Sequence, residues 1–186
     1  MERLLLWGKK QVKPALLVID ILNDFVKGPL KTREAEIIIN PAKTTINAFR
    51  KKGYPIFYVN DSHYKEDFEI ELWGPHAMKN SRGAKVYEEL EPHDSDYIIE
   101  KHTYSGFFET PLDYLLRTLR IDTVFLIGLD ADICVRHTAA DAFFRGYKIY
   151  VVRDAVASRI DKNWEEYFSK VYNAKIINSL ELEEYL

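Results

Sequence analysis

The chain has 186 residues, and its 26 lysines and arginines against 29 aspartates and glutamates give a net charge of −3. Hydrophobic residues make up 47% and charged residues 30%, which is ordinary for one globular domain with a sizeable core. This charge balance does not favour nucleic acid or an anionic membrane surface, and no apolar run is long enough to cross a bilayer. We therefore expect neither nucleic acid nor a membrane as a partner.

The cysteine content and the start of the chain indicate the compartment. Cys134 is the only cysteine, which excludes an internal disulfide and is typical of a reducing interior. The apolar stretch from Leu4 to Trp7 is too short for a secretory signal. We expect a cytoplasmic protein with one domain over residues 1–186, in which residues 1–13 are an N-terminal extension that packs on the domain or on a second subunit.

Short apolar runs alternate with helical patterns along the chain. Apolar runs that end in polar residues predict strands, and apolar residues at helical spacing predict helices. A helix over 41–52 is expected to have Asn40 as its N-cap and Gly53 as its stop, and residues 61–95 form a long polar excursion, which is usually functional in a compact domain. In chain order the pattern predicts a strand at 15–20, a helix at 41–52, strands at 55–60 and 96–100, a helix at 111–120, a strand at 123–127, a helix at 132–145, a strand at 148–153, a helix at 164–171, a strand at 175–178 and a last short helix in the tail.

This alternation predicts an α/β fold with a parallel sheet covered by helices on both faces, which is a three-layer, doubly wound arrangement. Ligands of such sheets bind outside the carboxyl ends of the strands. The predicted strand ends carry polar groups: Asp20, then Asp61 with His63, then Lys101, and finally the segment leading to Cys134. Together these groups predict a functional site at one edge of the sheet.

The acid, the amine and the thiol form a set that suits nucleophilic catalysis. Cys134 lies in the first turn of a predicted helix, where the helix dipole and free backbone N–H groups favour the thiolate. Asp20 can accept the thiol proton, and Lys101 can hold that carboxylate ionised. The thiolate would attack an amide carbonyl, with the backbone N–H groups of Asp130 and Cys134 as oxyanion donors, and ammonia would leave before water releases the acid. The alternative is a structural Asp20–Lys101 ion pair beside an inert cysteine.

A second group of residues has the composition of a metal site. Asp61 and His63 lie on one side of an extended segment, and Glu69 and His76 follow within the polar excursion. Nitrogen and carboxylate ligands together predict a divalent ion, zinc first, with iron or manganese as alternatives. The competing interpretation is that these are ordinary surface histidines.

Several motifs in combination resemble the isochorismatase-like superfamily of cysteine hydrolases and, within it, the nicotinamidases. The resemblance extends from Pro14 to about Ile177. It rests on the motifs VIDILNDF at 18–25, NDSH at 60–63, WGPH at 73–76, EKHTYSGF at 100–107, DICV at 132–135 and DAVAS at 154–158.

The resemblance implies roles for particular residues. It implies the catalytic triad Asp20, Lys101 and Cys134, which is the set reached above from the strand ends. The metal ligands of the nicotinamidases correspond to Asp61, His63 and His76. Some members have an additional glutamate ligand, and Glu69 stands at that position. The family's substrate contacts correspond to Phe25 and Trp73, an aromatic clamp on a flat ring, and to Tyr104 beside the pocket.

The resemblance also implies the architecture and the activity. It predicts an isochorismatase-like hydrolase fold with six parallel strands ordered 3-2-1-4-5-6, a cis peptide at Leu129–Asp130, and a homo-oligomer, either a dimer or a tetramer. The leading hypothesis is a nicotinamidase, which converts nicotinamide and water to nicotinate and ammonia, with the metal holding the pyridine nitrogen. The alternatives are an N-carbamoylsarcosine amidase-like or other small-amide hydrolase, and a catalytically silent binding protein on the same fold.

One residue departs from the nicotinamidase pattern. Asp130 stands in the turn before the nucleophile, where nicotinamidases usually carry a small or neutral residue. A carboxylate facing the pocket there would repel an acidic substrate and favour a substrate with an exposed hydrogen-bond donor.

Overall fold

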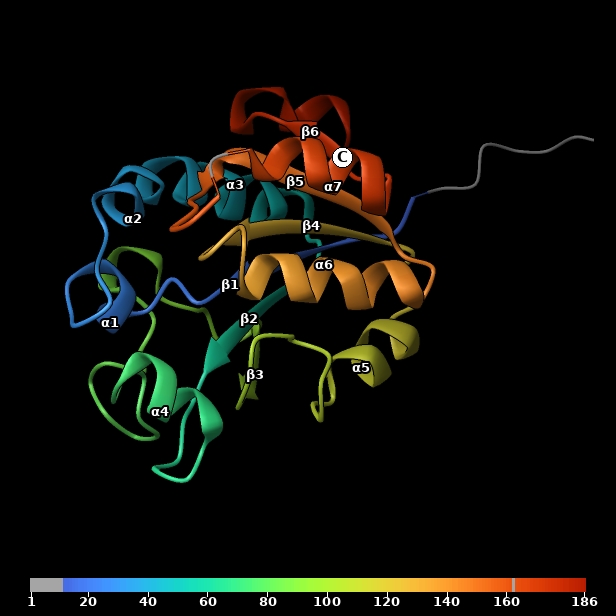
Figure 1. The fold of residues 1–186 in the computed structure, drawn as a ribbon. Coiled ribbons are helices and arrows are strands. Elements are labelled where there is room, and N and C mark those ends of the chain that lie inside the picture. Colours follow the sequence, from blue (N-terminus) through green and yellow to red (C-terminus); the bar gives the residue numbers. More distant parts are fainter. Residues whose placement is uncertain (1–11, 162) are drawn as a thin grey trace, which may run out of the picture.

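A computed structural model describes residues 12–161 and 163–186 of the chain and contains one parallel sheet of six strands (Figure 1). The strand order is β3-β2-β1-β4-β5-β6, which confirms both the predicted fold class and the predicted order. Each predicted strand is present to within a few residues. The bounds are β1 Pro14–Ile19, β2 Ile56–Asp61, β3 Tyr97–Lys101, β4 Thr123–Gly128, β5 Lys148–Val156 and β6 Lys175–Ile177.

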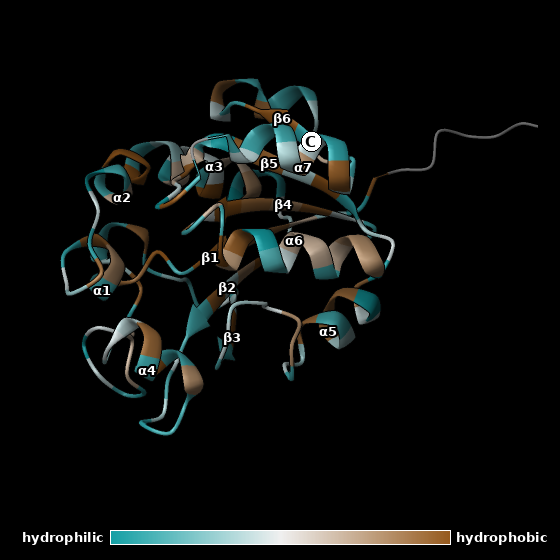
Figure 2. Cartoon of the chain, viewed as in Figure 1, coloured by the Kyte–Doolittle hydropathy of each residue, from teal (hydrophilic) through white to brown (hydrophobic). Residues whose placement is uncertain are grey.

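The central strands are apolar because both faces of the sheet are covered. Every residue of β1, β2 and β4 is buried, whereas the edge strand β3 alternates between buried and more exposed residues. In Figure 2 the central strands are brown over most of their length. Continuous apolar runs are expected of parallel strands that lie between two layers of helices.

Alternate residues of β1 point into two separate hydrophobic cores. Leu17 and Ile19 pack in one core with residues of α5, α6 and α7, whereas Leu16 and Val18 pack in the other with residues of α2 and α3. The sheet therefore lies between two helical layers, as Figure 1 shows. The helices are α1 Asn23–Val26, α2 Arg33–Ile37, α3 Ile39–Lys52, α4 Phe68–Trp73, α5 Leu112–Thr118, α6 Cys134–Phe144 and α7 Trp164–Tyr172, with 3-10 helices at Glu88–Leu90 and Ser179–Glu184.

The predicted cap of α3 is wrong, although its end is correct. The helix begins at Ile39 and follows α2 with only Ile38 between them, so Asn40 and Pro41 lie inside its first turn. The capping side chain belongs to α2, where Thr32 accepts a hydrogen bond from the backbone N–H of Ala35. Gly53 ends α3 in the left-handed conformation, at φ 69°, as the sequence predicted.

Three short helices were not predicted. α1 and α2 lie between β1 and α3, and α4 lies in the polar excursion after β2. With four to six residues each, they are too short to give a helical periodicity that can be recognised in the sequence. The last short helix in the tail is present as the 3-10 helix Ser179–Glu184.

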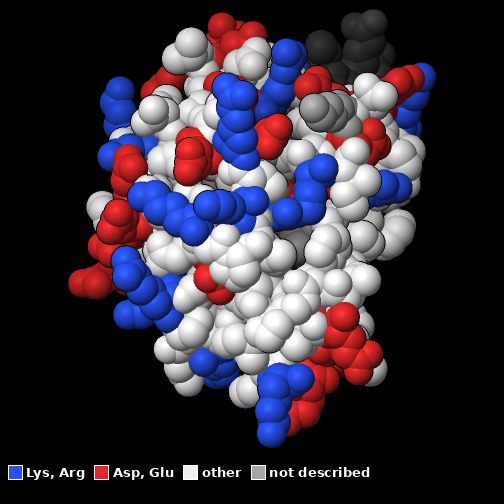
Figure 3. Space-filling model, turned by 60° about the vertical axis from the view of Figure 1, so that its left-hand side comes forward, with Lys and Arg blue, Asp and Glu red and all other residues white. Residues whose placement is uncertain are grey.

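The surface mixes charges of both signs. Figure 3 shows lysine and arginine side chains next to aspartate and glutamate side chains, beside an area without charge in the lower half of the view. None of the helices in residues 12–161 and 163–186 is long and apolar enough to cross a membrane. The expected packing of Leu4 to Trp7 lies outside the described residues.

Candidate active site

The carboxyl ends of neighbouring strands bring the predicted polar residues together. Asp20 directly follows β1, Asp61 ends β2, Lys101 ends β3, and Cys134 begins α6 after β4. All four side chains are buried, and Asp20 and Lys101 are each 0% exposed. Asp20 adopts φ 52°, which is an uncommon conformation for a residue other than glycine. Such strain is found mainly where a function requires a side chain to be held in place.

A buried lysine links two of these carboxylates. Lys101 Nζ lies 2.8 Å from Asp20 Oδ2 and also donates a hydrogen bond to Asp61 Oδ1. The backbone N–H of Asp61 donates to Asp20 Oδ1 at 2.7 Å. One ligand atom each from Asp20, Asp61 and Cys134 lie within 4.8 Å of one another. The structure thus brings together Asp20, Lys101 and Cys134, which are far apart along the chain.

The electrostatics of this cluster allow Asp20 to act as a base and keep Lys101 protonated. Burial and the charge of Asp61 raise the pKa of Asp20 to about 7, although Lys101 opposes that shift. Burial alone would lower the pKa of Lys101, but Asp20 and Asp61 raise it well above its usual value, so Lys101 stays protonated. Asp20 Oδ2 receives no well-directed hydrogen bond from the described residues, which leaves it able to accept a proton.

The expectation that the surroundings of Cys134 favour its thiolate is wrong for the protein without a bound substrate or metal. Burial raises the pKa of the Cys134 thiol well above its usual value, and the charges of Asp20, Asp61 and Glu69 add to this effect against Lys101. Desolvation is the largest of these effects, and together with the carboxylates it exceeds the opposing effect of the Lys101 charge. The thiol must therefore lose its proton to a neighbouring base during a reaction.

The turn between β4 and α6 presents free backbone donors beside the thiol. The Leu129–Asp130 peptide is cis, as the resemblance implied. Ala131 donates its N–H to the carbonyl of Ala157, and Ile133 and Val135 donate to the carbonyl of Asp130. Within residues 12–161 and 163–186, the backbone N–H groups of Asp130 and Cys134 have no acceptor. Both are available to a developing oxyanion.

The predicted metal ligands also converge. Asp61, His63, Glu69 and His76 are all buried, and one ligand atom from each lies within 4.8 Å of the others. His63 Nε2 lies 3.6 Å from Asp61 Oδ2 and 3.9 Å from Glu69 Oε2, and His76 Nε2 lies 4.0 Å from Asp61 Oδ2. Ligand atoms of a tetrahedral zinc ion are roughly 3.4 Å apart, so a small contraction would complete such a site. Their burial argues against the alternative of ordinary surface histidines.

Hydrogen bonds orient the two imidazoles with their Nε2 atoms toward the centre of the cluster. His63 Nδ1 lies 3.0 Å from Asp67 Oδ2, and His76 Nδ1 lies 2.8 Å from the carbonyl oxygen of Gly74. Partners of this kind fix the ring orientation of metal-binding histidines. His63 Nε2 and Glu69 Oε1 are buried without a hydrogen-bond partner in the described part of the chain. A divalent cation would satisfy both atoms, so these residues fit a metal ion.

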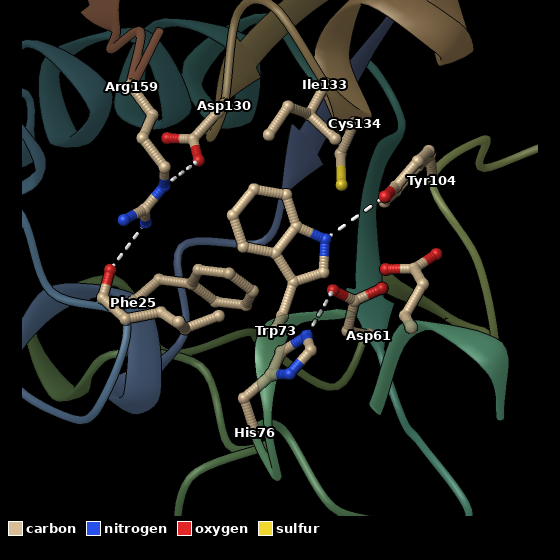
Figure 4. Close-up of a pocket in the computed structure, with 11 residues that line it drawn as sticks. Phe25, Asp61, Trp73, His76, Tyr104, Asp130, Ile133, Cys134 and Arg159 are labelled. Atoms are coloured by element: carbon tan, nitrogen blue, oxygen red, sulfur yellow. Dashed lines mark hydrogen bonds and ion pairs between the residues drawn. The ribbon is translucent and has the colours of Figure 1, made fainter. Parts of the chain in front are cut away.

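A narrow cavity connects the thiol with the metal cluster. Its free volume is only about 20 Å³, so a substrate would require its side chains to move. Figure 4 shows the Trp73 indole in the middle of this cavity, between Phe25 and Tyr104, with its Nε1–H donating to the Tyr104 hydroxyl at 3.1 Å. The lining residues are Phe25, Leu30, Asp61, Glu69, Trp73, His76, Tyr104, Asp130, Ile133, Cys134 and Arg159.

Leu30, Ile133 and Arg159 line the cavity without having been predicted from the sequence, whereas an Asp130 carboxylate facing the pocket was considered there. Leu30 and Ile133 contribute apolar wall, and Asp130 presents its carboxylate to the cavity. Arg159 Nε donates to Asp130 Oδ2 at 2.8 Å, and its Nη2 donates to the carbonyl of Leu30 at 2.6 Å. The sequence did contain an indication of Arg159. This residue comes directly after the DAVAS motif, and that motif follows the carboxyl end of a predicted strand. Asp67, which orients His63, gave no comparable signal.

The strand order and the groups at the carboxyl edge of the sheet define an isochorismatase-like hydrolase. The chain belongs to the isochorismatase family, because the family's Isochorismatase domain matches residues 14–179. This membership confirms the resemblance and the expected enzyme class, a hydrolase.

Solved structures of similar chains have the same fold. N-carbamoylsarcosine amidase from Thermoplasma acidophilum is 56% identical, with 90% of this chain and 97% of that chain covered and a TM-score of 0.89. Nicotinamidase PncA from Bacillus subtilis is 31% identical, with 90% and 100% covered and a TM-score of 0.84. Pyrazinamidase of Pyrococcus horikoshii in complex with zinc is 31% identical, with 89% and 99% covered and a TM-score of 0.81.

Proposed function

We propose that the protein is a cysteine-dependent amidohydrolase that releases ammonia from a small amide through a thioester intermediate. The observation that carries this proposal is the meeting of Asp20, Lys101 and Cys134 in one buried cluster, with a sulfur and a carboxylate oxygen within 4.8 Å of each other. A structural ion pair beside an inert cysteine would not need two free backbone N–H groups next to the thiol.

In the proposed mechanism Asp20 is the base that activates the nucleophile. The Asp20 carboxylate accepts the Cys134 proton, and the sulfur attacks the amide carbonyl carbon. The backbone N–H groups of Asp130 and Cys134 hold the oxyanion, and the protonated Asp20 gives its proton to the leaving ammonia. Asp20 then takes a proton from the water that attacks the thioester, and it returns this proton to the Cys134 sulfur as the carbon–sulfur bond breaks, which frees the acid and restores the thiol. Lys101 holds the Asp20 carboxylate in position throughout.

An N-carbamoyl amino acid is the first substrate that we propose. Asp130 and Arg159 form an ion pair in the cavity wall, and the guanidinium hydrogen bonds found among the described residues use Arg159 Nε and Nη2, not Nη1. The paired guanidinium offsets the charge of Asp130, which by itself would repel an acidic substrate, and a guanidinium in this position can receive a substrate carboxylate. The T. acidophilum relative, at 56% identity, carries the name N-carbamoylsarcosine amidase, which supports the same choice.

Nicotinamide is the second candidate, and a different set of contacts favours it. Phe25 and Trp73 line the cavity with aromatic surface suited to a flat ring, and the metal cluster borders the same cavity. A divalent ion held by Asp61, His63, Glu69 and His76, zinc first, would supply a coordination position for a heteroatom of the substrate. The B. subtilis and P. horikoshii relatives carry nicotinamidase and pyrazinamidase names.

A homo-oligomer and a cytoplasmic location complete the proposal. Phe68, Phe108 and Phe144 are 92%, 58% and 75% exposed and line one shallow groove, which favours association of two or more copies. The composition and the single free cysteine suit a reducing compartment.

The test is an ammonia-release assay on N-carbamoyl amino acids and nicotinamide with zinc-loaded protein, comparing wild type with Cys134→Ala. We expect turnover by the wild type, a fall of at least about a thousandfold in the variant, and an acyl adduct on the Cys134 peptide in mass spectrometry of the quenched reaction. Because the chain has one cysteine, the adduct has only one thiol to occupy. Full activity in Cys134→Ala would show that the thioester mechanism is wrong.

A further inference from the structure

The segment that carries His76 has an unusual backbone. Gly74 adopts φ 75° and Ala77 adopts φ 41°, so positive φ angles stand on both sides of this proposed metal ligand. A residue with a Cβ, such as Ala77, rarely adopts such an angle and keeps it only where surrounding contacts hold it in place. Ala77 is also 0% exposed. The position of His76 therefore depends on groups outside its own segment.

Both polar groups of the Ala77 backbone have partners elsewhere in the chain. The Ala77 N–H donates to Asp24 Oδ2 at 2.9 Å, and the Ala77 carbonyl accepts a hydrogen bond from the backbone N–H of His63 at 3.0 Å. Ala77 directly follows one proposed metal ligand, His76, and is hydrogen-bonded to another, His63. The Asp24 carboxylate thus supports the backbone that links these two ligands.

Asp24 belongs to α1, and this helix is attached to the same segment by further hydrogen bonds. The Asp24 N–H donates to the carbonyl of Gly83 at 3.2 Å. The Asn23 side chain donates through Nδ2 to the carbonyl of Arg82 at 2.9 Å. These bonds hold α1 against residues 77–83, so the carboxylate reaches the segment from a helix that is itself fixed there.

Two glycines make room for the Asp24 carboxylate. A Cβ on Gly83 would stand 2.0 Å from Asp24 Oδ2, and a Cβ on Gly28 would stand 2.5 Å from Asp24 Oδ1. At Gly83 the atoms in the way are the end of the Asp24 side chain, so an added methyl group would displace the carboxylate. The contact between Asp24 and Ala77 can therefore be broken from two independent positions.

We propose that Asp24 is a positioning residue for the metal site. It is not one of the four proposed ligands: its carboxylate fixes the Ala77 backbone and through it sets where the imidazoles of His63 and His76 stand. A divalent ion binds more tightly when its ligands are held in place before it arrives. The inference rests on the metal site of the proposed function and adds to it a residue that contacts no ligand side chain through its carboxylate.

The test measures the zinc affinity of the full chain by competition with a chromophoric chelator, which requires no turnover. Asp24→Ala should bind zinc about tenfold more weakly than wild type, as for the loss of an orienting partner. Asp24→Asn keeps an oxygen that can accept from the Ala77 N–H and should restore most of the affinity. A loss in Asp24→Asn equal to that in Asp24→Ala would assign the effect to the negative charge and overturn the inference.

A second variant displaces the same carboxylate without removing it. Gly83→Ala places a methyl group where Asp24 Oδ2 lies, so zinc affinity should again fall roughly tenfold. Asp24→Ala has no carboxylate to displace, so adding Gly83→Ala to it should change the affinity no further. Equal losses from Gly83→Ala with and without the carboxylate would contradict the inference. If Asp24→Ala does not fold, Gly83→Ala decides alone, and an unchanged affinity there refutes the role of Asp24.

Asp154→Ala is the matched control. Asp154 Oδ1 accepts the backbone N–H of Ser179 at 2.8 Å, so this variant also removes a carboxylate that holds a backbone N–H. Asp154 is not part of the metal cluster, and the zinc affinity of Asp154→Ala should equal that of wild type. A loss as large as that of Asp24→Ala would show that general loosening of the fold accounts for both.

Failure of this inference and failure of the proposed function give different results. Unchanged zinc affinity in folded Asp24→Ala and Gly83→Ala overturns the inference, while an acyl adduct on Cys134 still supports the hydrolase mechanism. A reaction without that adduct overturns the mechanism, while the zinc affinities still decide the role of Asp24. A wild type that takes up no zinc, iron or manganese overturns both the metal site and this inference.

Discussion

Gly128 and Ile19 approach so closely that a Cβ on Gly128 would stand 1.9 Å from the carbonyl oxygen of Ile19. The two residues face each other in the pairing of β4 with β1, and the backbone N–H of Leu129 donates to the same Ile19 carbonyl at 2.9 Å. Asp20 follows Ile19, and the turn that carries Asp130 and leads to Cys134 follows Gly128. This contact therefore sets the distance between the proposed base and the proposed nucleophile.

Gly128→Ala should destabilise the protein strongly. Gly128 has φ 123°, which a residue with a Cβ rarely adopts, and the added carbon has no space against the Ile19 backbone. Overpacking and backbone strain together predict a loss of about 3 kcal/mol in the free energy of unfolding, measured by urea titration.

Gly53→Ala is the matched control for this change. Gly53 also has positive φ, 69°, but a Cβ there would meet nothing within 4 Å. Only the conformational cost remains, so the loss should be about 1 kcal/mol. Equal losses in the two variants would show that the close contact with Ile19 contributes nothing.

Lys101→Met should damage both stability and activity. The lysine is 0% exposed and contacts the carboxylates of Asp20 and Asp61, so its removal leaves these two buried carboxylates without the ammonium that pairs with them. Breaking a buried pair from one side costs about 3–5 kcal/mol. We expect a loss of this size in the metal-free protein by urea titration at neutral pH, with no detectable turnover.

An exposed lysine provides the comparison for Lys101→Met. Lys170 pairs with Glu166 one helical turn away, and both side chains are mostly exposed to solvent. Lys170→Met should leave stability and turnover unchanged, since solvent screens such pairs. If Lys101→Met were as stable as wild type, the burial of the Asp20 and Asp61 carboxylates would not depend on the Lys101 ammonium.

The sequence predicted the sheet and most of the site because both follow from simple rules. Continuous apolar runs become buried parallel strands, and parallel strands bring their carboxyl ends to one edge. Asp20, Asp61 and Lys101 each stand at such an end, and their convergence could be expected without coordinates. Cys134 could also be expected at this edge, because it lies in the first turn of the helix that follows the fourth strand.

Other features depend on tertiary contacts that no local pattern encodes. The high pKa of Cys134 results from burial next to three carboxylates contributed by distant parts of the chain. Arg159 reaches Asp130 from the segment after β5, and Asp67 orients His63 from a loop. α4 is too short to show periodicity, so the sequence did not indicate that Glu69 and Trp73 share one helix.

Asp67→Ala should weaken metal binding without removing a ligand. Asp67 Oδ2 contacts His63 Nδ1 at 3.0 Å, which points His63 Nε2 toward the other proposed ligands. Loss of such an orienting partner typically costs 10–100-fold in metal affinity. Competition with a chromophoric zinc chelator measures this affinity independently of activity.

Asp94→Ala serves as the control for Asp67→Ala, because Asp94 is exposed and distant from the cluster along the chain. It should bind one zinc ion with wild-type affinity. His63→Ala should bind far more weakly than Asp67→Ala, since it removes a ligand atom itself. If wild type takes up no zinc, iron or manganese, the metal site is refuted and the buried His63 Nε2 needs another partner.

Tyr104→Phe should raise KM and leave kcat close to its wild-type value. The Tyr104 hydroxyl accepts the hydrogen bond from Trp73 Nε1 at 3.1 Å, and this bond holds the indole across the cavity. Loss of one neutral hydrogen bond corresponds to roughly a two- to tenfold rise in KM. kcat should not change, because Asp20 and Cys134 keep their positions. Tyr114→Phe removes a hydroxyl from a side chain that is 71% exposed and should change neither constant. A fall in kcat with an unchanged KM would instead assign the Tyr104 hydroxyl to the reacting groups.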